Sequence, residues 1–386
     1  MNQYINPNEY GSLLYDDKEI EYVNNVIKQR RIFRYSRCEF PYTSMCEDKI
    51  KEIVNTKYAL CTTNGTSGLK AALIGAGVEA NDRVLISSYT FLATALAPIS
   101  LGAIPVPIEV DIETGLDLND LEEEIKKGCK AVIVVHFQGR AFNLSKVKKL
   151  CKDNNIVLIE DACQAFGAKY KSKYTGTIGD IGVYSFQQFK QISSGEGGCV
   201  VTNTKKYFDR MRNYTDMGSI RDRFPSWNSE EALFGENDRM NNLIGAVLYA
   251  QLEKMDMIIN KQKELRKEII SKLDKVTIIN SPDPSGDTAM NILLLLKDVE
   301  SKKQAIELGK ESNIELRNMW SSLYYDNDLF RRNKLDSLSL RNKECLKTKD
   351  LITRMVVVSI PPTLTNTDFK EIKKLILLLK EKELME

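Results

Sequence analysis

The 386-residue sequence has a single histidine, no Cys-x-x-Cys pair and almost no net charge, and each of these gaps excludes a class of protein. One histidine and eight scattered cysteines do not offer the clustered ligands of a zinc site, so no metal centre is expected. A formal charge of +2 gives no electrostatic reason to bind nucleic acid or a membrane surface. No apolar run approaches the roughly 18 residues that a membrane-spanning helix requires.

The chain is long enough for one large domain and a smaller one. We predict a large domain at residues 1–250, the N-terminal segment included, and a smaller α+β domain at residues 251–386. The opening residues, Met1 to Tyr4, lack the basic and apolar stretches of a secretory signal peptide. The expected location is therefore the cytoplasm.

Apolar runs alternate with amphipathic stretches between residues 57 and 160, and two more apolar runs follow. This alternation is typical of strands and helices in a βαβ series. The predicted strands are 58–62, 83–88, 104–110, 131–136, 156–159, 181–186 and 199–202, and the predicted helices are 66–76, 92–101, 118–127 and 144–153. The predicted fold class is α/β, with a mostly parallel seven-stranded sheet flanked by helices.

Further elements are predicted outside this series. A helix is expected at 17–29, and a long helix is expected to open within 235–240 and to continue to about residue 273. The stretch 203–236 is predicted to hold loops and short helices. In the C-terminal part we expect strands at 291–296 and 355–360, and helices at 301–312 and from 366 onward, the last introduced by Thr365 and Asp368.

Three polar residues lie at the ends of neighbouring predicted strands. Asp161 follows one strand, Ser185 ends another, and Lys190 lies in the turn after it. Ligands of open α/β sheets bind beyond the carboxyl ends of the strands. There, a lysine amine can form a Schiff base with the aldehyde of pyridoxal 5′-phosphate (PLP), and an aspartate can keep the pyridine nitrogen protonated.

Such an aspartate has enough electrostatic effect for that role. Two unit charges about 4 Å apart at an effective dielectric constant of about 20 attract each other by roughly 4 kcal/mol, which corresponds to about three pKa units. Taken singly, Asp161 is more simply explained as a buried structural acid and Lys190 as a surface lysine. The combination of motifs is what favours a cofactor site.

Asp161-x-x-Gln164, Ser185-Phe186-x-x-x-Lys190 and the run from Gly195 to Gly198 occur in this order. Together they resemble the DegT/DnrJ/EryC1/StrS family of sugar aminotransferases, and the resemblance extends from about residue 17 to the C-terminus. It implies a PLP enzyme of fold type I with Lys190 as the catalytic lysine, which moves the proton between the amino donor and the cofactor.

The resemblance also assigns residues to the cofactor. By their residue types alone, Gly65, Thr66 and Ser67 form a helix start that either is an ordinary N-cap or holds an anion. In the family the matching turn binds the PLP phosphate. The cofactor-binding residues implied are Gly65, Thr66, Ser67 and Ser185 for the phosphate, Phe91 for stacking on the ring, Gln164 for the ring hydroxyl, Asp161, Lys190, and Asn237 for the phosphate in the neighbouring subunit.

Substrate contacts are predicted in two places. Residues 30–37 contain four arginines, and this run is either a solvated loop or a loop that binds a phosphate or carboxylate group of the substrate. In fold-type-I enzymes the small domain closes over the substrate, which implicates a second stretch around residue 320. The predicted substrate-binding residues are Arg31, Arg34, Tyr35, Arg317, Trp320 and Tyr325.

The resemblance implies ping-pong transfer of an amino group from glutamate or glutamine to a keto-sugar, by a homodimer with a composite active site. The acceptor stays open among nucleotide-linked keto-hexoses, keto-cyclitols and higher keto-sugar acids. Two alternatives also stay open: a PLP-dependent dehydratase or lyase, and a non-catalytic regulator. Many relatives have histidine where this chain has Phe166, and a structural role is expected for His136.

Overall fold

The structure is a computed structural model that describes residues 10–218, 220–221, 225–226, 232–271, 273, 278–320, 322–332 and 343–386. The expectation about a signal peptide concerns residues 1–4, which lie outside this description. No helix within the described ranges is both long enough and apolar enough to cross a lipid bilayer.

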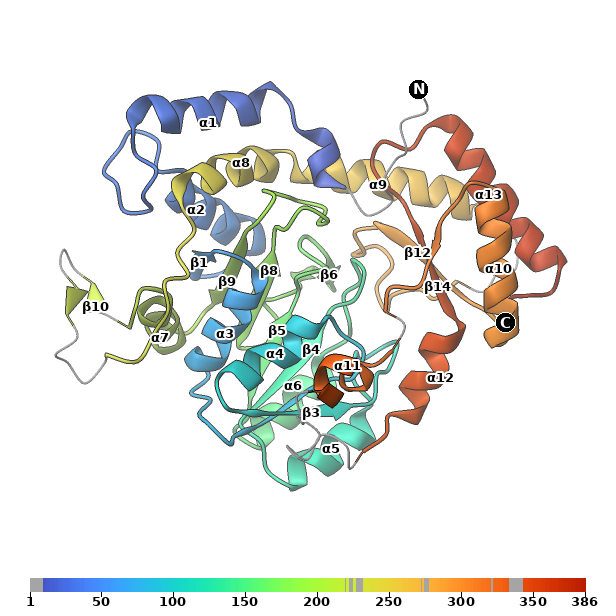
Figure 1. Ribbon diagram of the computed structural model, residues 1–386, viewed down its shortest axis with the longest axis horizontal. Coiled ribbons are helices and arrows are strands. Elements are labelled where there is room, and N and C mark those ends of the chain that lie inside the picture. Colours follow the sequence, from blue (N-terminus) through green and yellow to red (C-terminus); the bar gives the residue numbers. More distant parts are fainter. Residues whose placement is uncertain are drawn as a thin grey trace.

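A seven-stranded sheet forms the centre of the larger part of the molecule (Figure 1). Its order is β1-β9-β8-β5-β4-β2-β3, and β9 is antiparallel to both neighbours whereas the other pairs are parallel. The strands are β1 (Tyr58–Thr62), β2 (Arg83–Ser87), β3 (Ile104–Ile108), β4 (Ala131–Val135), β5 (Val157–Asp161), β8 (Ile181–Ser185) and β9 (Gly198–Thr202). The predicted mostly parallel seven-stranded sheet is confirmed.

Helices lie against this sheet because the connections between parallel strands must cross over it. They are α3 (Gly65–Gly75), α4 (Leu92–Ser100), α5 (Leu118–Lys126) and α6 (Ser145–Asp153). Every residue of β4 is buried, as expected for a central strand that is covered on both faces. The predicted bounds of these strands and helices differ from the observed ones by one or two residues at most.

The long helix begins later than the sequence pattern predicts, so the prediction of a start within 235–240 is wrong. It consists of α8 (Asn242–Glu253) followed by α9 (Met255–Ile270), and residues 235–240 are not helical. Asn241 fixes the start, because its side-chain oxygen accepts hydrogen bonds from two backbone N–H groups of the first turn, at 3.0 and 3.1 Å. By contrast, α1 (Asp17–Gln29) has the predicted bounds.

Three α-helices of the described residues have no counterpart in the sequence prediction, namely α2 (Tyr42–Val54), α11 (Asp328–Arg332) and α12 (Leu346–Arg354). The N-cap of α2, Pro41, offers no side-chain cap. The α7 helix (Lys205–Thr215) lies in the stretch predicted to hold loops and short helices. The α2 helix packs closely on α8, since a Cβ on Gly245 would come within 2.6 Å of a Thr43 atom. The remaining short elements are η1 (Gly11–Leu14), β6 (Lys169–Tyr170), β7 (Lys173–Tyr174), β10 (Ile220–Arg221), β11 (Pro225–Ser226) and η2 (Tyr324–Asp326).

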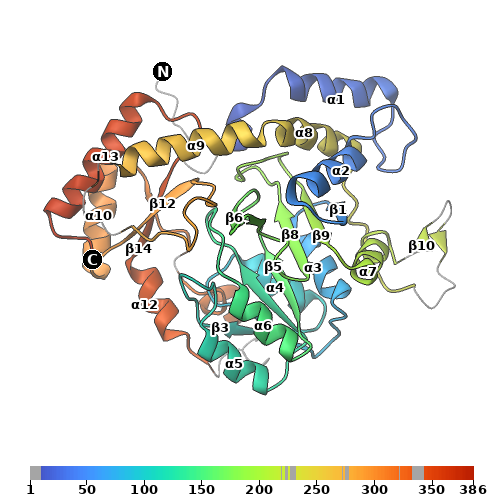
Figure 2. The same cartoon turned by 180° about the vertical axis from the view of Figure 1, so that it is seen from behind.

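A three-stranded antiparallel sheet lies to one side of the large sheet (Figures 1 and 2). Its order is β12-β14-β13, and apolar side chains on one of its faces form a hydrophobic cluster of their own, whereas Leu293 and Val357 belong to the cluster of the large sheet. Its elements are β12 (Asn291–Leu295), β13 (Leu316–Arg317), β14 (Met355–Ser359), α10 (Val299–Glu311), α12 (Leu346–Arg354) and α13 (Asn366–Glu381). The predicted domain boundary at residue 250 falls near the junction of α8 and α9, and the division stays a prediction.

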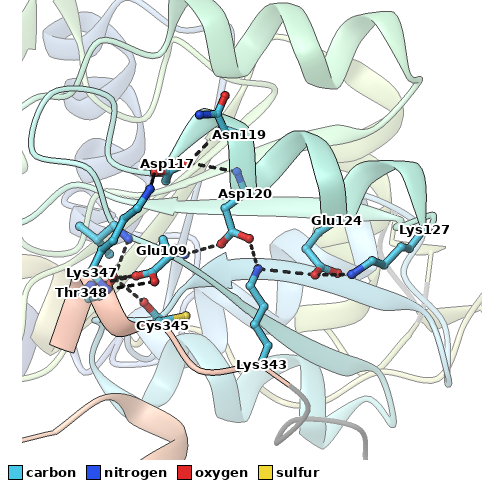
Figure 3. A network of polar contacts seen from close by, with 12 residues as sticks. Glu109, Asp117, Asn119, Asp120, Glu124, Lys127, Lys343, Cys345, Lys347 and Thr348 are labelled. Carbon is cyan, nitrogen blue, oxygen red and sulfur yellow. Dashed lines mark hydrogen bonds and ion pairs between the residues drawn. The ribbon is translucent and has the colours of Figure 1, made fainter.

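Charged side chains join α12 and the segment before it to α5 of the large sheet (Figure 3). Lys347 Nζ lies 2.7 Å from Asp117 Oδ2, and Lys343 forms an ion pair with Asp120 and lies 3.5 Å from Glu124 Oε1. Because α12 leads directly into β14, the central strand of the small sheet, these pairs connect the small sheet to the large one.

Candidate active site

A cavity of about 800 Å³ lies beyond the carboxyl ends of β5 and β8. Both Asp161 and Lys190 line it, together with the first turn of α3 and with Arg317 and Trp320 from the C-terminal part of the chain. The structure therefore brings together the groups that the sequence predicts to act on one cofactor. No cluster of three or more metal-ligating side chains occurs within the described ranges.

Lys190 is held by its backbone and not by its side chain. Its N–H donates to the carbonyl of Gln187 at 2.9 Å, and its carbonyl accepts from the N–H of Gly11 at 3.2 Å. Among the described residues, the Lys190 amine has no hydrogen bond and no ion pair. A half-buried amine on an anchored turn is well placed to act as a nucleophile or base.

Asp161 is buried with 5% of its surface exposed, and no cation of the described chain pairs with it. One carboxylate oxygen accepts from Thr94 Oγ1 at 2.8 Å and the other from the N–H of Cys163 at 3.2 Å. Neutral donors compensate such a burial only partly. The carboxylate is therefore suited to a cationic group of a ligand, such as a protonated ring nitrogen.

The start of α3 has the features of an anion cradle. Asn64 caps the helix by accepting from the N–H of Ser67 at 2.8 Å, and no described group accepts from the N–H of Gly65 or Thr66. A Cβ on Gly65 would lie 2.9 Å from both Cys163 Sγ and Ser185 Cβ, so glycine keeps this space open. Free N–H groups at a helix N-terminus favour a phosphate.

Other predicted cofactor residues surround this cradle. Ser185 and Gln164 line the cavity, and so does Phe91, which precedes α4 and is 57% exposed. Ser67 also lines the cavity, but its hydroxyl donates to Asp238 Oδ1 at 2.9 Å. The exposed ring of Phe91 is suited to stacking on a planar cofactor.

Asn237 lies outside this cavity, in the extended segment before α8. Its side chain is exposed, and its backbone forms a bridge with Asp216. Its predicted contact with the phosphate therefore requires another subunit and stays a prediction.

Two of the six predicted substrate residues, Arg317 and Trp320, line the cavity, and four do not. Trp320 packs edge-on against Tyr89, with ring centroids 4.9 Å apart, and its backbone N–H donates to the Tyr89 hydroxyl at 3.4 Å. Tyr325 is buried away from the cavity, where its hydroxyl accepts from the N–H of Cys345 at 3.0 Å.

The arginine-rich loop lies near the segment that carries Asn237. Arg34 is buried and forms an ion pair with Glu47, so its charge is compensated within the chain. Tyr35 donates to Asp216 at 3.0 Å, and Arg31 is exposed. None of these three lines the cavity of its own chain, and their contact with substrate stays a prediction.

Two residues close to the predicted site, Cys163 and His136, were not assigned to the cofactor or the substrate. Burial, reinforced by the charge of Asp161, raises the pKa of the Cys163 thiol well above its ordinary value, so it stays protonated near neutral pH. His136 is fully buried, with Nε2 2.8 Å from Glu160 Oε2 and Nδ1 accepting from the N–H of Phe142 at 3.2 Å. The structural role expected for His136 agrees with these contacts.

Sequence reasoning did not assign five residues at or near the cavity. Gln138 lies in the loop shortly after the end of β4, and its position after a buried strand was the available signal. The others carry no comparable local pattern. The five residues are Tyr10, Thr94, Gln138, Asp238 and Asn291.

The sequence matches known proteins over most of its length. Residues 14–376 match the sequence profile of the DegT/DnrJ/EryC1/StrS aminotransferase family. A GDP-perosamine synthase of Escherichia coli O157:H7 is 36% identical over 249 residues, which are 64% of this chain and 66% of that protein. A putative L-glutamine:3-amino-2,3-dideoxy-scyllo-inosose aminotransferase of Micromonospora echinospora is 31% identical over 260 residues, which are 66% of this chain and 60% of that protein. Each match spans slightly less than two thirds of the relative's length.

Solved structures agree with the fold. The aminotransferase of Psychrobacter cryohalolentis superimposes with a TM-score of 0.82 at 23% identity, covering 96% of this chain and 98% of that one. At this identity the likeness concerns the fold alone, which is the α/β fold of type I PLP aminotransferases.

Proposed function

The chain belongs to the DegT/DnrJ/EryC1/StrS aminotransferase family, and from this membership we propose that it is a PLP-dependent aminotransferase that moves an amino group from glutamate or glutamine to a keto-sugar. The observation that carries the proposal is the presence of the Lys190 amine, the Asp161 carboxylate and the open start of α3 in one cavity. A nucleophile, a buried negative charge and an anion cradle match the aldehyde, the ring nitrogen and the phosphate of PLP.

Each of these groups has a separate task. The N–H groups of Gly65 and Thr66 and the hydroxyl of Ser185 bind the phosphate, and Phe91 covers the ring. Asp161, oriented by Thr94, keeps a positive charge on the ring nitrogen. PLP, when bound, supplies the electron sink that makes the α-carbon of the amino donor acidic. The Nζ of Lys190 holds the cofactor and moves a proton at that carbon.

The rest of the cavity supports a sugar-like substrate. Trp320 offers an aromatic surface of the kind that packs on sugar rings, and Arg317 offers a hydrogen-bond donor for an anionic group. The names of the two curated relatives support a nucleotide-linked keto-hexose or a keto-cyclitol as the acceptor, and a higher keto-sugar acid belongs to the same chemical class.

A homodimer would complete the site. Asn237 is exposed and does not line the cavity of its own chain, so it is available to the phosphate of the partner subunit. The exposed residues Arg31 and Tyr35 lie on one loop. This loop contacts the start of α8, since the carbonyls of Arg31 and Ile32 accept hydrogen bonds from Asn242, shortly after the segment that carries Asn237. We propose that both segments reach the partner's cavity together.

The test is to incubate the purified protein with PLP and glutamate. Transamination predicts loss of the visible absorbance of the lysine-bound cofactor and the appearance of 2-oxoglutarate, whereas Lys190→Ala should produce neither the absorbance nor the product. With a keto-sugar present, ping-pong transfer predicts parallel double-reciprocal plots, and intersecting lines would contradict it. Release of water or a fragment without glutamate consumption would indicate a dehydratase or lyase, and PLP binding without turnover a regulator.

A further inference from the structure

A row of buried polar side chains connects the small sheet to the wall of the cavity. Arg317 Nη2, on β13, donates to Asn291 Oδ1, on β12, at 3.1 Å. Asn291 Nδ2 donates to Gln138 Oε1, in the loop after β4. Gln138 Nε2 then donates to Gln164 Oε1 at 2.9 Å. Arg317, Asn291 and Gln138 are all at least nine-tenths buried, so water does not compete for these groups.

The direction of this row is fixed by its first member. A side-chain amide has a donor end and an acceptor end and can turn over, whereas a guanidinium can only donate. Asn291 must therefore present its oxygen to Arg317 and its nitrogen to Gln138. By the same reasoning, Gln138 presents its nitrogen to Gln164. The oxygen of Gln164 is then occupied, and its NH₂ group remains as a donor.

Tyr10 strengthens this assignment at the start of the row. Its hydroxyl oxygen accepts from Arg317 Nη2 at 3.1 Å, so its only hydrogen is donated to Asn291 Oδ1, at 2.8 Å. The Asn291 oxygen thus receives two donors. At the other end, the backbone N–H of Gln138 also donates to Gln164 Oε1, at 3.3 Å, so this oxygen accepts from both the backbone and the side chain of Gln138. The second hydrogen of Gln138 Nε2 is donated to Met319 Sδ, at 3.4 Å.

We propose that Asn291 and Gln138 are positioning residues that fix Gln164 as a hydrogen-bond donor at the cavity wall, where it meets the ring hydroxyl oxygen of the cofactor. Asn291 does not line the cavity, and its effect on Gln164 passes through Gln138. The inference rests on the proposed function, because PLP supplies the acceptor. If the inference holds, the affinity for the cofactor depends on the arrangement of the two sheets, because the row forms only while β12 and β13 face the loops after β4 and β5.

The test compares PLP with 3-deoxypyridoxal phosphate, which lacks the ring hydroxyl. Dissociation constants are measured on the cofactor-free protein through quenching of the tryptophan fluorescence, to which Trp320 in the lining of the cavity contributes. One charge-assisted hydrogen bond predicts that the wild-type protein prefers PLP by roughly 10- to 100-fold. In Asn291→Asp the new carboxylate can only accept, so Gln138 turns its NH₂ toward it, Gln164 turns in response, and the preference falls by about tenfold or more.

Tyr10→Phe is the matched control. It also removes a hydrogen bond to Asn291, but Arg317 remains as an obligate donor, so the direction of the row and the preference for PLP should be retained. Gln138→Glu places a carboxylate, which can only accept, directly beside Gln164, so Gln164 should turn its NH₂ group toward it. This variant replaces Asn291→Asp in the test if Asn291→Asp does not fold. A wild-type preference that persists in both Asn291→Asp and Gln138→Glu would overturn the inference. A wild-type protein that binds neither compound would instead refute the proposed function.

Discussion

The carboxylate of Glu109 accepts a hydrogen bond from the backbone N–H of Thr348 at 2.8 Å, and so a residue next to β3 caps the first turn of α12 (Figure 3). The same carboxylate accepts from the N–H of Lys347 at 3.1 Å. Its charge lies at the positive end of the helix, where it is stabilising.

The first prediction concerns this cap. Glu109→Gln keeps the shape of the side chain but removes its charge, and it should lower the free energy of unfolding by about 1–2 kcal/mol. Denaturant unfolding measures the loss, and hydrogen exchange should be faster in α12. Glu113→Gln, at an exposed position four residues further along the chain, is the control. Equal stability of both variants would mean that the cap does not contribute.

The second prediction concerns the charge of Asp161. Asp161→Asn keeps the hydrogen bonds to Thr94 and Cys163 possible but removes the partner of the ring nitrogen. Loss of an interaction of roughly 4 kcal/mol should weaken PLP binding or slow transamination by about 100- to 1000-fold. Thr94→Val leaves the charge in place and should cost about tenfold at most. If both variants behave alike, the charge is not what the site requires.

The third prediction tests the composite site by complementation. Lys190→Ala and Asn237→Ala should each be strongly impaired as homodimers. Co-expressed in equal amounts, they should form mixed dimers in which one of the two sites receives both native residues. Random assortment then restores about a quarter of the wild-type sites. Mixed dimers that form without regaining activity would place Asn237 in its own chain's site.

The fourth prediction concerns Lys302, on α10. Burial lowers the pKa of its amine to about 8, from an ordinary value of 10.5. The amine donates to the carbonyl of Ile352 at 2.7 Å and to Asn318 Oδ1 at 3.2 Å, and no acid among the described residues pairs with it. Between pH 8 and 10.5 the unfolded chain holds a proton that the folded chain lacks, so this residue makes folding more favourable as pH rises.

Lys302→Met should remove that contribution. Relative to the variant, the wild-type protein should gain stability through this pH range by at most about 1.4 kcal/mol per pH unit. Chemical denaturation at several pH values gives the difference. Lys303→Met, the exposed neighbour, should follow the wild-type profile. A constant difference between Lys302→Met and wild type would show that the amine does not titrate in this range.

Local pattern predicted the fold, and it predicted that Asp161 and Lys190 lie together, because both features are encoded in short stretches. The strands and helices of the large sheet carry regular apolar periods, and Asp161 and Lys190 lie at or shortly after strand ends. The contact between Tyr10 and Asn291 joins residues 281 positions apart, and no local signal encodes it.

The sequence pattern also did not predict which charged residues form ion pairs with each other. From the sequence, Arg34 is a reasonable anion-binding residue. In the structure its charge is compensated by Glu47, which lies on the unpredicted helix α2. The start of α8 depended on which of several polar residues supplies the cap, and the periodicity of the helix does not decide that. Both cases involve a partner that only tertiary structure identifies.

The burial of His136 gives the protein a built-in spectroscopic reporter. It is the only imidazole in the chain, and Phe142 donates to Nδ1, so the ring hydrogen lies on Nε2 and is donated to Glu160. Glu160 also accepts from the backbone N–H of Gly176 at 2.8 Å. A nitrogen-15 spectrum of selectively labelled protein would therefore contain one slowly exchanging ring signal per subunit. The chemical shift of this signal would report on the contact between β4, β5 and the loop that packs on them.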